Sequence, residues 1–441
     1  MANKNRILID TNFAIKQEAL NKYESLVNKI NKEIENNDVV GHQFLGSFAV
    51  RKNYQKENFE EIKNLPKLLL SENIDTLVII ASQHICLQSQ ALIDLVRGKY
   101  PENNNKNLNV IFVDETINGR DIAQLIRYLE SKNFAINVIS QTGETIETLL
   151  IFRELKLLLQ KAVGIVNASN YIYVTTNNNY GKLFKEVQLN KYKHFVLLDN
   201  STEKFFSFSP AILVPLACAG IDIEAYVNGA AEANEYYKNA PLKDNSAYIY
   251  ALSRFILEKN NFKIENINYY SNAENKLASL FRMYLTEACL RKTHGILVST
   301  NRQSADLCTY SESLINAPFK CFETSIICDN PKFDYSISLS QDNDDDYYNY
   351  LSKLTYNTIG KTINRTITEN HVINYKIPNL KIIIENYEET TLGWIVVFIQ
   401  RAAVMCAYLQ NINPFDNVGT RSYSIELMKN ITELTGGSKN D

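Results

Sequence analysis

The sequence has few of the features typical of secreted, metal-binding or nucleic-acid-binding proteins. Its seven cysteines are an odd number, and they form no CxxC pair and no zinc-like spacing with histidine. The 46 Lys and Arg nearly balance the 49 Asp and Glu, so the formal charge is only -3. These absences argue against a disulfide framework, a zinc site, and electrostatic binding to nucleic acid or an anionic membrane.

Long hydrophobic runs are also missing. The N-terminus, M-A-N-K-N-R-I-L-I-D, has no signal-peptide core, and apolar segments such as 211–219 are too short to span a membrane. We therefore expect a cytoplasmic protein with buried thiols. The length of 441 residues allows two or three domains, and 45% hydrophobic and 22% charged residues are ordinary for a globular chain.

Strands and helices alternate through the first half of the sequence. Short β-rich apolar runs occur at 76–80, 109–113, 135–139, 171–175 and 194–198. Helical patterns separate them, which predicts right-handed crossovers and a doubly wound parallel sheet. In such sheets ligands bind at the carboxyl ends of the strands.

A second series of strands follows a mainly helical stretch. We expect these strands at 264–269, 295–298, 321–328 and 380–385, with helices before the first series and after the second. The acidic run at 342–348 lacks the glycine and the final glutamate of a calcium loop, so a solvated loop is expected there.

One turn between a strand and a helix is rich in hydroxyl groups. Ser140, Thr142 and Thr145, together with Gly143, separate the strand 135–139 from an amphipathic helix. The unpaired N–H groups at the positive end of that helix, with added hydroxyl donors, suit a phosphate group. The same residues also suit an ordinary N-cap, so these residues alone leave both interpretations open.

Six segments carry a wider resemblance. They are N-Y-Q-K at 53–56, I-N-V-I-S-Q-T-G-E-T-I-E at 136–147 with F-R at 152–153, V-P-L-A-C-A-G-I-D-I-E-A-Y-V-N-G at 214–229, A-Y-x-Y-A-x-x-R at 247–254, F-E-T at 322–324, and G-x-x-I-x-F to N-P-F-D-x-x-G at 393–419. In order and spacing they resemble bacterial glucose-6-phosphate isomerases.

The resemblance implies an α/β fold with two sugar-isomerase (SIS-type) doubly wound parallel-sheet domains. It places them at 71–240 and 241–390, between helical segments at 1–70 and 391–441. It also implies a homodimer with its active site near the subunit interface. The implied reaction interconverts glucose 6-phosphate and fructose 6-phosphate through an enediol(ate), without a metal or cofactor.

The resemblance also implies roles for particular residues. Glu287 stands at the position of the base, and Ser140, Thr142 and Thr145 stand at the phosphate-binding hydroxyl positions. Lys204 replaces an arginine that stabilises negative charge, and it cannot form the same two-pronged contact.

Other positions depart from the family pattern. Gln141 replaces a lysine and Glu144 a threonine beside the expected phosphate, and a carboxylate about 5 Å from a phosphate costs on the order of a kcal/mol unless it is turned away or countered. The family's glycine-rich turn after the first strand is here 81–85, A-S-Q-H-I, without glycine.

The ring-opening positions are also substituted. The family's histidine and lysine align with Cys308 and Ser424, and neither is an adequate acid or base at neutral pH unless its pKa is strongly shifted. His84, His294 or His371 could take the role only if folding brought one of them into the site.

Three hypotheses therefore remain open from the sequence. The first is an active glucose-6-phosphate isomerase that depends on Glu287. The second is a catalytically degenerate relative that binds sugar phosphates or acts as an interaction protein. The third is a different aldose–ketose isomerase with an altered phosphate end.

Overall fold

The computed structural model describes residues 5–48, 56–98, 100, 107–291, 294–340, 346–416 and 420–434. Residues 53–55 of the first matching segment, most of the acidic run 342–348, and residues 417–419 lie outside this description.

The first sheet has five parallel strands in the order β3-β2-β4-β5-β6. Their bounds are β2 Thr76–Ile80, β3 Asn109–Val113, β4 Phe134–Ile139, β5 Ile172–Thr176 and β6 Lys193–Val196. The chain leaves β2 toward β3 on one side and returns to β4 on the other, so the strand order reverses between β2 and β4. All five predicted strands are present, with the ends of the last three shifted by one or two residues.

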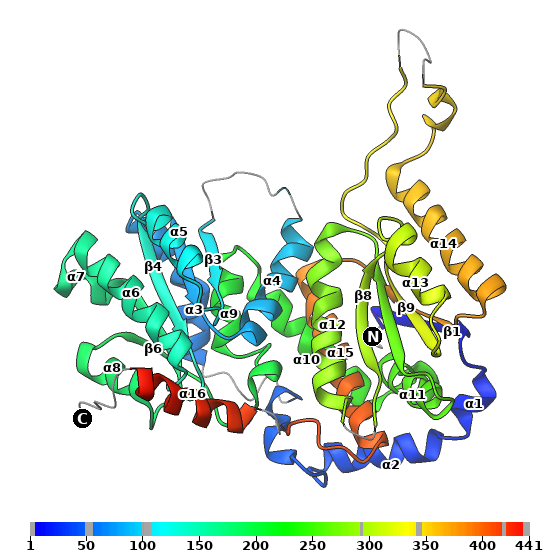
Figure 1. The fold of residues 1–441 in the computed structure, drawn as a ribbon, viewed down its shortest axis with the longest axis horizontal. Coiled ribbons are helices and arrows are strands. Elements are labelled where there is room, and N and C mark those ends of the chain that lie inside the picture. The colour runs from blue at the N-terminus through cyan, green and yellow to red at the C-terminus, as the bar shows by residue number, and fades with distance from the viewer. Residues whose placement is uncertain are drawn as a thin grey trace.

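Helices connect these strands and flank the sheet, which lies in the left half of Figure 1. They are α3 Lys56–Ser71, α4 Gln83–Arg97, α5 Gly119–Leu129, α6 Ile146–Val163, α7 Ile165–Ala168 and α8 Lys182–Asn190. Every residue of β2, β4 and β5 is buried, as expected for central strands covered on both faces.

The second sheet repeats this arrangement in the right half of Figure 1. Its order is β1-β10-β9-β7-β8, and all neighbours are parallel except β1, which pairs antiparallel with β10. The bounds are β1 Ile7–Phe13, β7 Ile264–Tyr269, β8 Leu297–Arg302, β9 Cys321–Cys328 and β10 Asn379–Ile384. The expected α/β class with two doubly wound sheets is confirmed.

The strand β1 corrects the expectation that residues 1–70 are helical. Ile7 is fully buried against Ile384, whereas Leu8 is 54% exposed, so the two faces of this edge strand differ. Its partner β10 lies more than 360 positions later in the sequence, and this long-range pairing determines the conformation. The predicted strand at 295–298 also begins and ends later, at Leu297–Arg302.

A helical layer joins the two sheets. It contains α2 Glu24–Glu35, α9 Pro210–Cys218, α10 Ile223–Asn239, α11 Ser246–Lys259, α12 Asn275–Cys289 and α15 Glu389–Leu409. A Cβ atom at Gly229 or Gly393 would collide with the backbone of the opposite helix, so these glycines permit the close approach of α10 and α15.

Helix α15 is the only described helix long and apolar enough to cross a membrane. Within this helix, 94% of the 18-residue apolar stretch is buried inside the protein, as in a core helix.

The remaining elements lie at the edges of the molecule. They are α1 Gln17–Asn21, α13 Glu312–Ile315, α14 Tyr356–Tyr375 and α16 Thr420–Leu434. In Figure 1 the chain around α14 extends away from the second sheet, and α16 lies along the first-sheet half of the molecule.

Candidate active site

The candidate site lies where the carboxyl ends of β2 and β4 meet the helical layer. His84 is in the first turn of α4, directly after β2, and the hydroxyl loop 140–145 follows β4. Because the strand order reverses between β2 and β4, this edge is where a doubly wound sheet binds its ligand. Lys204 comes from the short helix Glu203–Phe205, and Glu287 from the last turn of α12.

Glu287 and His84 form a direct contact. The His84 Nε2 atom lies 3.0 Å from Oε1 and 2.9 Å from Oε2 of Glu287, and about a third of each side chain is exposed. On the other side of the ring, Nδ1 lies 3.9 Å from Glu203 Oε2. The imidazole therefore stands between two carboxylates.

These neighbours shift the pKa values of both groups. Burial alone would raise the pKa of the Glu287 carboxyl, but the hydrogen bond and charge of His84, with a contribution from Lys204, lower it below its usual value. Burial lowers the pKa of His84, whereas Glu287 and Glu203 raise it, and the net pKa lies above the ordinary histidine value.

Lys204 is a buried cation without a hydrogen bond to any described residue. Its Nζ atom lies 5.8 Å from the ring centroid of Phe205. Burial lowers the pKa of the ammonium, and the negative charge of Glu287 only partly offsets this lowering. A buried ammonium with unused donors is energetically costly. It is therefore available to an anionic group of a ligand.

Hydrogen bonds within the hydroxyl loop define its shape. The Ser140 hydroxyl accepts from the Gly143 N–H at 3.1 Å and lies 3.5 Å from the Thr145 hydroxyl. Thr142 Oγ1 accepts from the N–H of Glu144 at 3.3 Å. Thr145 is the N-cap residue of α6 but makes no side-chain capping bond, so the ordinary N-cap interpretation does not describe its hydroxyl.

The carboxylate of Glu144, which stands where the family pattern has a threonine, is turned toward helix α8. Glu144 Oε1 accepts from the backbone N–H of Lys182 at 2.9 Å, and Oε2 lies 3.9 Å from Lys182 Nζ. The N-terminus of α8 and a cation thus counter its charge. Gln141, which replaces the family's lysine, donates to the Ser201 carbonyl at 3.2 Å.

The other sequence candidates lie elsewhere or are not described. Cys308 is an exposed free thiol in the π-helix Leu307–Ser311, and Ser424 lies in α16, with its side chain outside the description. His371 is buried 3.1 Å from Glu323, and His294 is exposed.

Sequence reasoning named His84 only as one of three histidines that could take the acid–base role if folding brought it into the site, although its place directly after the strand 76–80 was a usable signal. Of the three histidines considered, it is the one that contacts Glu287.

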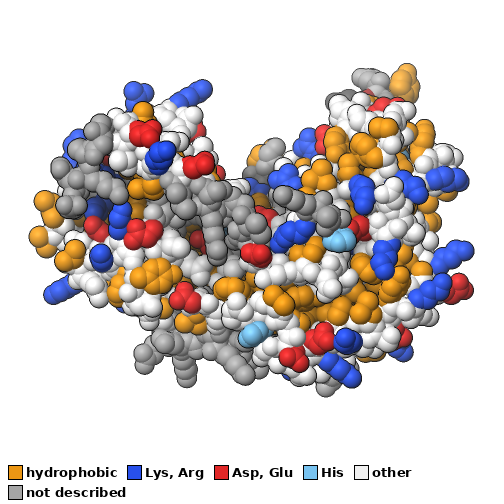
Figure 2. All heavy atoms as spheres, turned by 60° about the horizontal axis from the view of Figure 1, so that its bottom comes forward, with side chains coloured by type: hydrophobic (Ala, Val, Ile, Leu, Met, Phe, Trp, Pro, Cys, Tyr) orange, Lys and Arg blue, Asp and Glu red, His pale blue; other side chains and the backbone are white. Residues whose placement is uncertain are grey.

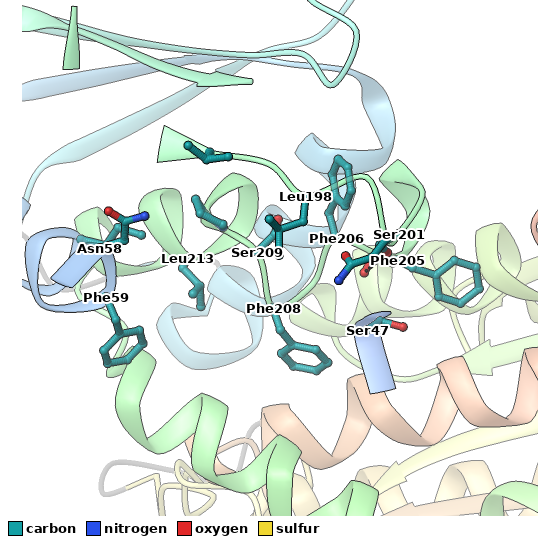
Figure 3. Close-up of a pocket in the computed structure, with 14 residues that line it drawn as sticks. Ser47, Asn58, Phe59, Leu198, Ser201, Phe205, Phe206, Phe208, Ser209 and Leu213 are labelled. Carbon is teal, nitrogen blue, oxygen red and sulfur yellow. Dashed lines mark hydrogen bonds between the residues drawn. The ribbon is translucent and has the colours of Figure 1, made fainter. Parts of the chain in front are cut away.

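A cavity of about 210 Å³ adjoins this site without containing its charged groups. Figure 3 shows Phe59, Phe206, Phe208 and Leu213 around it, with Ser201 and Phe205 at one end. Phe205 follows Lys204 in the short helix 203–205, which connects this end of the cavity to the candidate site. Its lining is largely apolar and contains no titratable side chain. Among the residues the structure describes, no three His, Cys, Asp or Glu side chains gather so that they could hold a metal ion.

Two doubly wound sheets, with a Glu–His pair beside a hydroxyl loop, define a protein of the sugar-isomerase α/β class. Solved structures with a similar fold include a hypothetical protein from Thermus thermophilus, with a TM-score of 0.84 and 19% identity over 96% of this chain and 99% of that one. A glucose-6-phosphate isomerase from Chlamydia trachomatis has a TM-score of 0.79 and 13% identity over 99% and 90% of the two chains.

Sequence comparisons give the particular family. The family profile described as Phosphoglucose isomerase matches residues 93–311. The glucose-6-phosphate isomerase of Mycoplasmopsis pulmonis is 35% identical over 424 residues, which cover 96% of this chain and 98% of that protein. That of Clostridioides difficile is 31% identical over 91% and 89% of the two chains. The chain belongs to the glucose-6-phosphate isomerase family, a family of aldose–ketose isomerases, and the predicted resemblance is confirmed.

Proposed function

We propose that this protein interconverts glucose 6-phosphate and fructose 6-phosphate through an enediol(ate), with Glu287 as the base. The observation that carries the proposal is the position of the Glu287 carboxylate, 2.9 Å from His84 Nε2, where His84 and Lys204 lower its pKa against the effect of burial. An ionised carboxylate can remove the proton from C2 of the open-chain aldose and return it to C1. The relatives from Mycoplasmopsis pulmonis and Clostridioides difficile are named glucose-6-phosphate isomerase, which is the enzyme of this reaction.

The remaining parts of the site fit the needs of that reaction. The enediolate oxygen requires a nearby cation, and the buried Lys204 ammonium has unused donors. Ser140, Thr142 and Thr145 lie at the N-terminus of α6, where a phosphate dianion is favoured. No metal or cofactor is needed for this proton transfer. The proposal keeps the domain division at 71–240 and 241–390, with β1 as an added strand of the second domain's sheet.

The proposal includes a homodimer in the cytoplasm. Residues 329–340 and 346–355, here called the arm, carry aromatic side chains that are each more than half exposed: Phe333, Tyr335, Tyr347, Tyr348 and Tyr350. Figure 2 shows hydrophobic side chains gathered on the half of the molecule that carries the second sheet, on the right. Exposed apolar surface of this kind supports an interface with a second subunit.

The test is conversion of fructose 6-phosphate by the purified protein, coupled to NADPH formation through glucose-6-phosphate dehydrogenase. Glu287→Gln serves as the matched variant, since it keeps the shape of the side chain and removes the base. We expect turnover that the variant loses by a factor of about 10² or more. Turnover no higher than that of the variant would favour the degenerate, sugar-phosphate-binding alternative.

A further inference from the structure

Opening of the sugar ring needs an acid–base group in this site. Both hexose phosphates are mainly cyclic in water, while proton transfer between C1 and C2 requires the open chain. The resemblance aligns Cys308 and Ser424 with the family's two ring-opening acid–base residues. Arg291 contacts the end of α12, but its guanidinium does not release a proton at physiological pH.

We propose that His84 is the acid–base residue that opens the ring. The inference rests on the proposed function, and it assigns a role to a position where the family pattern has a glycine-rich turn. The contact of His84 with Glu287 places the imidazole beside the group proposed to act on C1 and C2. A catalytic imidazole must stand near the reacting atoms, and a third of this side chain remains exposed for contact with a ligand.

The surroundings of His84 leave one ring nitrogen available. Nε2 is engaged by Glu287, while Nδ1, at 3.9 Å from Glu203 Oε2, has no hydrogen bond to a described residue. Gln88 Nε2 donates to the main-chain carbonyl of His84 at 2.9 Å, which fixes the backbone of this turn. The ring is therefore positioned while Nδ1 remains able to exchange a proton with a ligand.

The charged groups that face His84 come from three elements. Glu287 lies on α12, Glu203 and Lys204 lie on the short helix 203–205, and Glu115 lies just after β3. The carboxylates favour the imidazolium and Lys204 disfavours it, and the pKa of His84 is raised overall. The raised pKa favours the imidazolium, which is the form that a proton donor requires.

The proposed step neither gains nor loses a proton overall. In glucose 6-phosphate, the imidazolium gives its proton to O5 as the C1–O5 bond breaks, which leaves the carbonyl at C1 protonated on O1. The neutral imidazole then takes the proton from O1, so that one proton has moved from O1 to O5. In fructose 6-phosphate the same step breaks the C2–O5 bond and takes the proton from O2.

The decisive variant is His84→Gln, whose amide can still donate a hydrogen bond to Glu287 but cannot transfer a proton. His294→Gln is the matched control, because that histidine is exposed and belongs to no part of the site. We expect His84→Gln to lower kcat/KM by about 10²–10⁴-fold, and the control to leave it unchanged. Thermal melting of both variants checks that they fold.

A kinetic isotope effect separates ring opening from mere positioning of Glu287. With glucose 6-phosphate deuterated at C2, the isotope effect on kcat/KM reports how far removal of the C2 proton limits the rate. If His84 opens the ring, His84→Gln makes an isotope-insensitive step limiting, and the effect falls toward 1. An effect that rises in the variant would show that His84 only positions the base and would overturn the inference.

The remaining outcomes are equally decisive. Full activity in His84→Gln, together with a wild-type enzyme that needs Glu287, would overturn the role of His84 and leave the proposed function standing. Absence of turnover in the folded wild-type protein would overturn both.

Discussion

The side-chain amide nitrogen of Gln88 lies 3.0 Å from the main-chain carbonyl of Glu203, which is 115 positions later in the chain. The same nitrogen donates to the carbonyl of His84, while Oε1 of Gln88 accepts from Ser207 at 2.6 Å and from Tyr284 at 3.2 Å. One buried amide therefore connects the turn that carries His84 to the helix that carries Lys204. The relative positions of the site's imidazole and its cation depend on it.

Replacement of Gln88 by leucine should lower both stability and activity. Leucine fills a similar volume but leaves the buried partners of the amide unsatisfied, at a cost of about 1–3 kcal/mol in unfolding free energy. Urea unfolding can be followed by the fluorescence of Trp394, the single tryptophan of the sequence, which is fully buried. Gln83→Leu, an exposed position on the same helix, is the control and should change the free energy by less than about 0.5 kcal/mol.

The ion pair of His84 and Glu287 should make stability depend on pH. The raised pKa of His84 gives stability that is present below its unfolded value of 6.5 and is lost as the pH rises through the folded pKa. The lowered pKa of Glu287 gives stability that is present above its unfolded value of 4.5 and is lost as the pH falls through the folded pKa. The pair is therefore most stabilising between pH 4.5 and 6.5.

The measurement is the melting temperature of the wild type and of Glu287→Gln across pH 4 to 9. We expect the difference between them to be largest inside that window and to decline on both sides. A difference that stayed constant with pH would mean that the two side chains do not form an ion pair in solution.

The buried strands could be predicted from the sequence because their own residues determine them. Runs such as 76–80, a threonine followed by four β-rich apolar residues, are typical of a strand covered on both faces. The strand β1 was missed because it pairs along one edge, carries a charged residue and obtains its partner β10 from the far end of the chain.

The candidate site could be predicted only in part. The hydroxyl loop and Glu287 lie in segments with local patterns. The contact of His84 with Glu287 joins residues 203 positions apart and arises from the packing of α4 against α12, which no local pattern reports.

We expect subunit association to depend on the exposed aromatic side chains of the arm. Tyr348→Ser and Tyr350→Ser together remove two rings that are 57% and 74% exposed and pack little in the monomer. We expect sedimentation equilibrium to give a dimer for the wild type and a species shifted toward monomer for the double variant, with little change in circular dichroism. Leu189→Ser, an exposed position on α8, is the control and should leave the dimer intact. A double variant that remains fully dimeric would place the interface elsewhere.

Lys204 offers a prediction in which stability and activity change in opposite directions. The ammonium is buried, lacks a hydrogen bond to a described residue, and has its pKa lowered chiefly by burial. Lys204→Met keeps the length and apolar packing of the stem while removing the desolvated charge, so the unfolding free energy should rise by roughly 1 kcal/mol or more. If the cation stabilises the enediolate, kcat should fall by about 10²–10³-fold.

Both quantities can be measured on the same preparation, by urea unfolding and by the coupled assay. Lys204→Arg is the informative companion, since it retains the charge and restores the family's residue type. It should keep more activity than the methionine variant and should not share its gain in stability. If Lys204→Met instead lowered the unfolding free energy, the ammonium would have a partner that stabilises the folded state. Its donors would then not be free to bind the substrate.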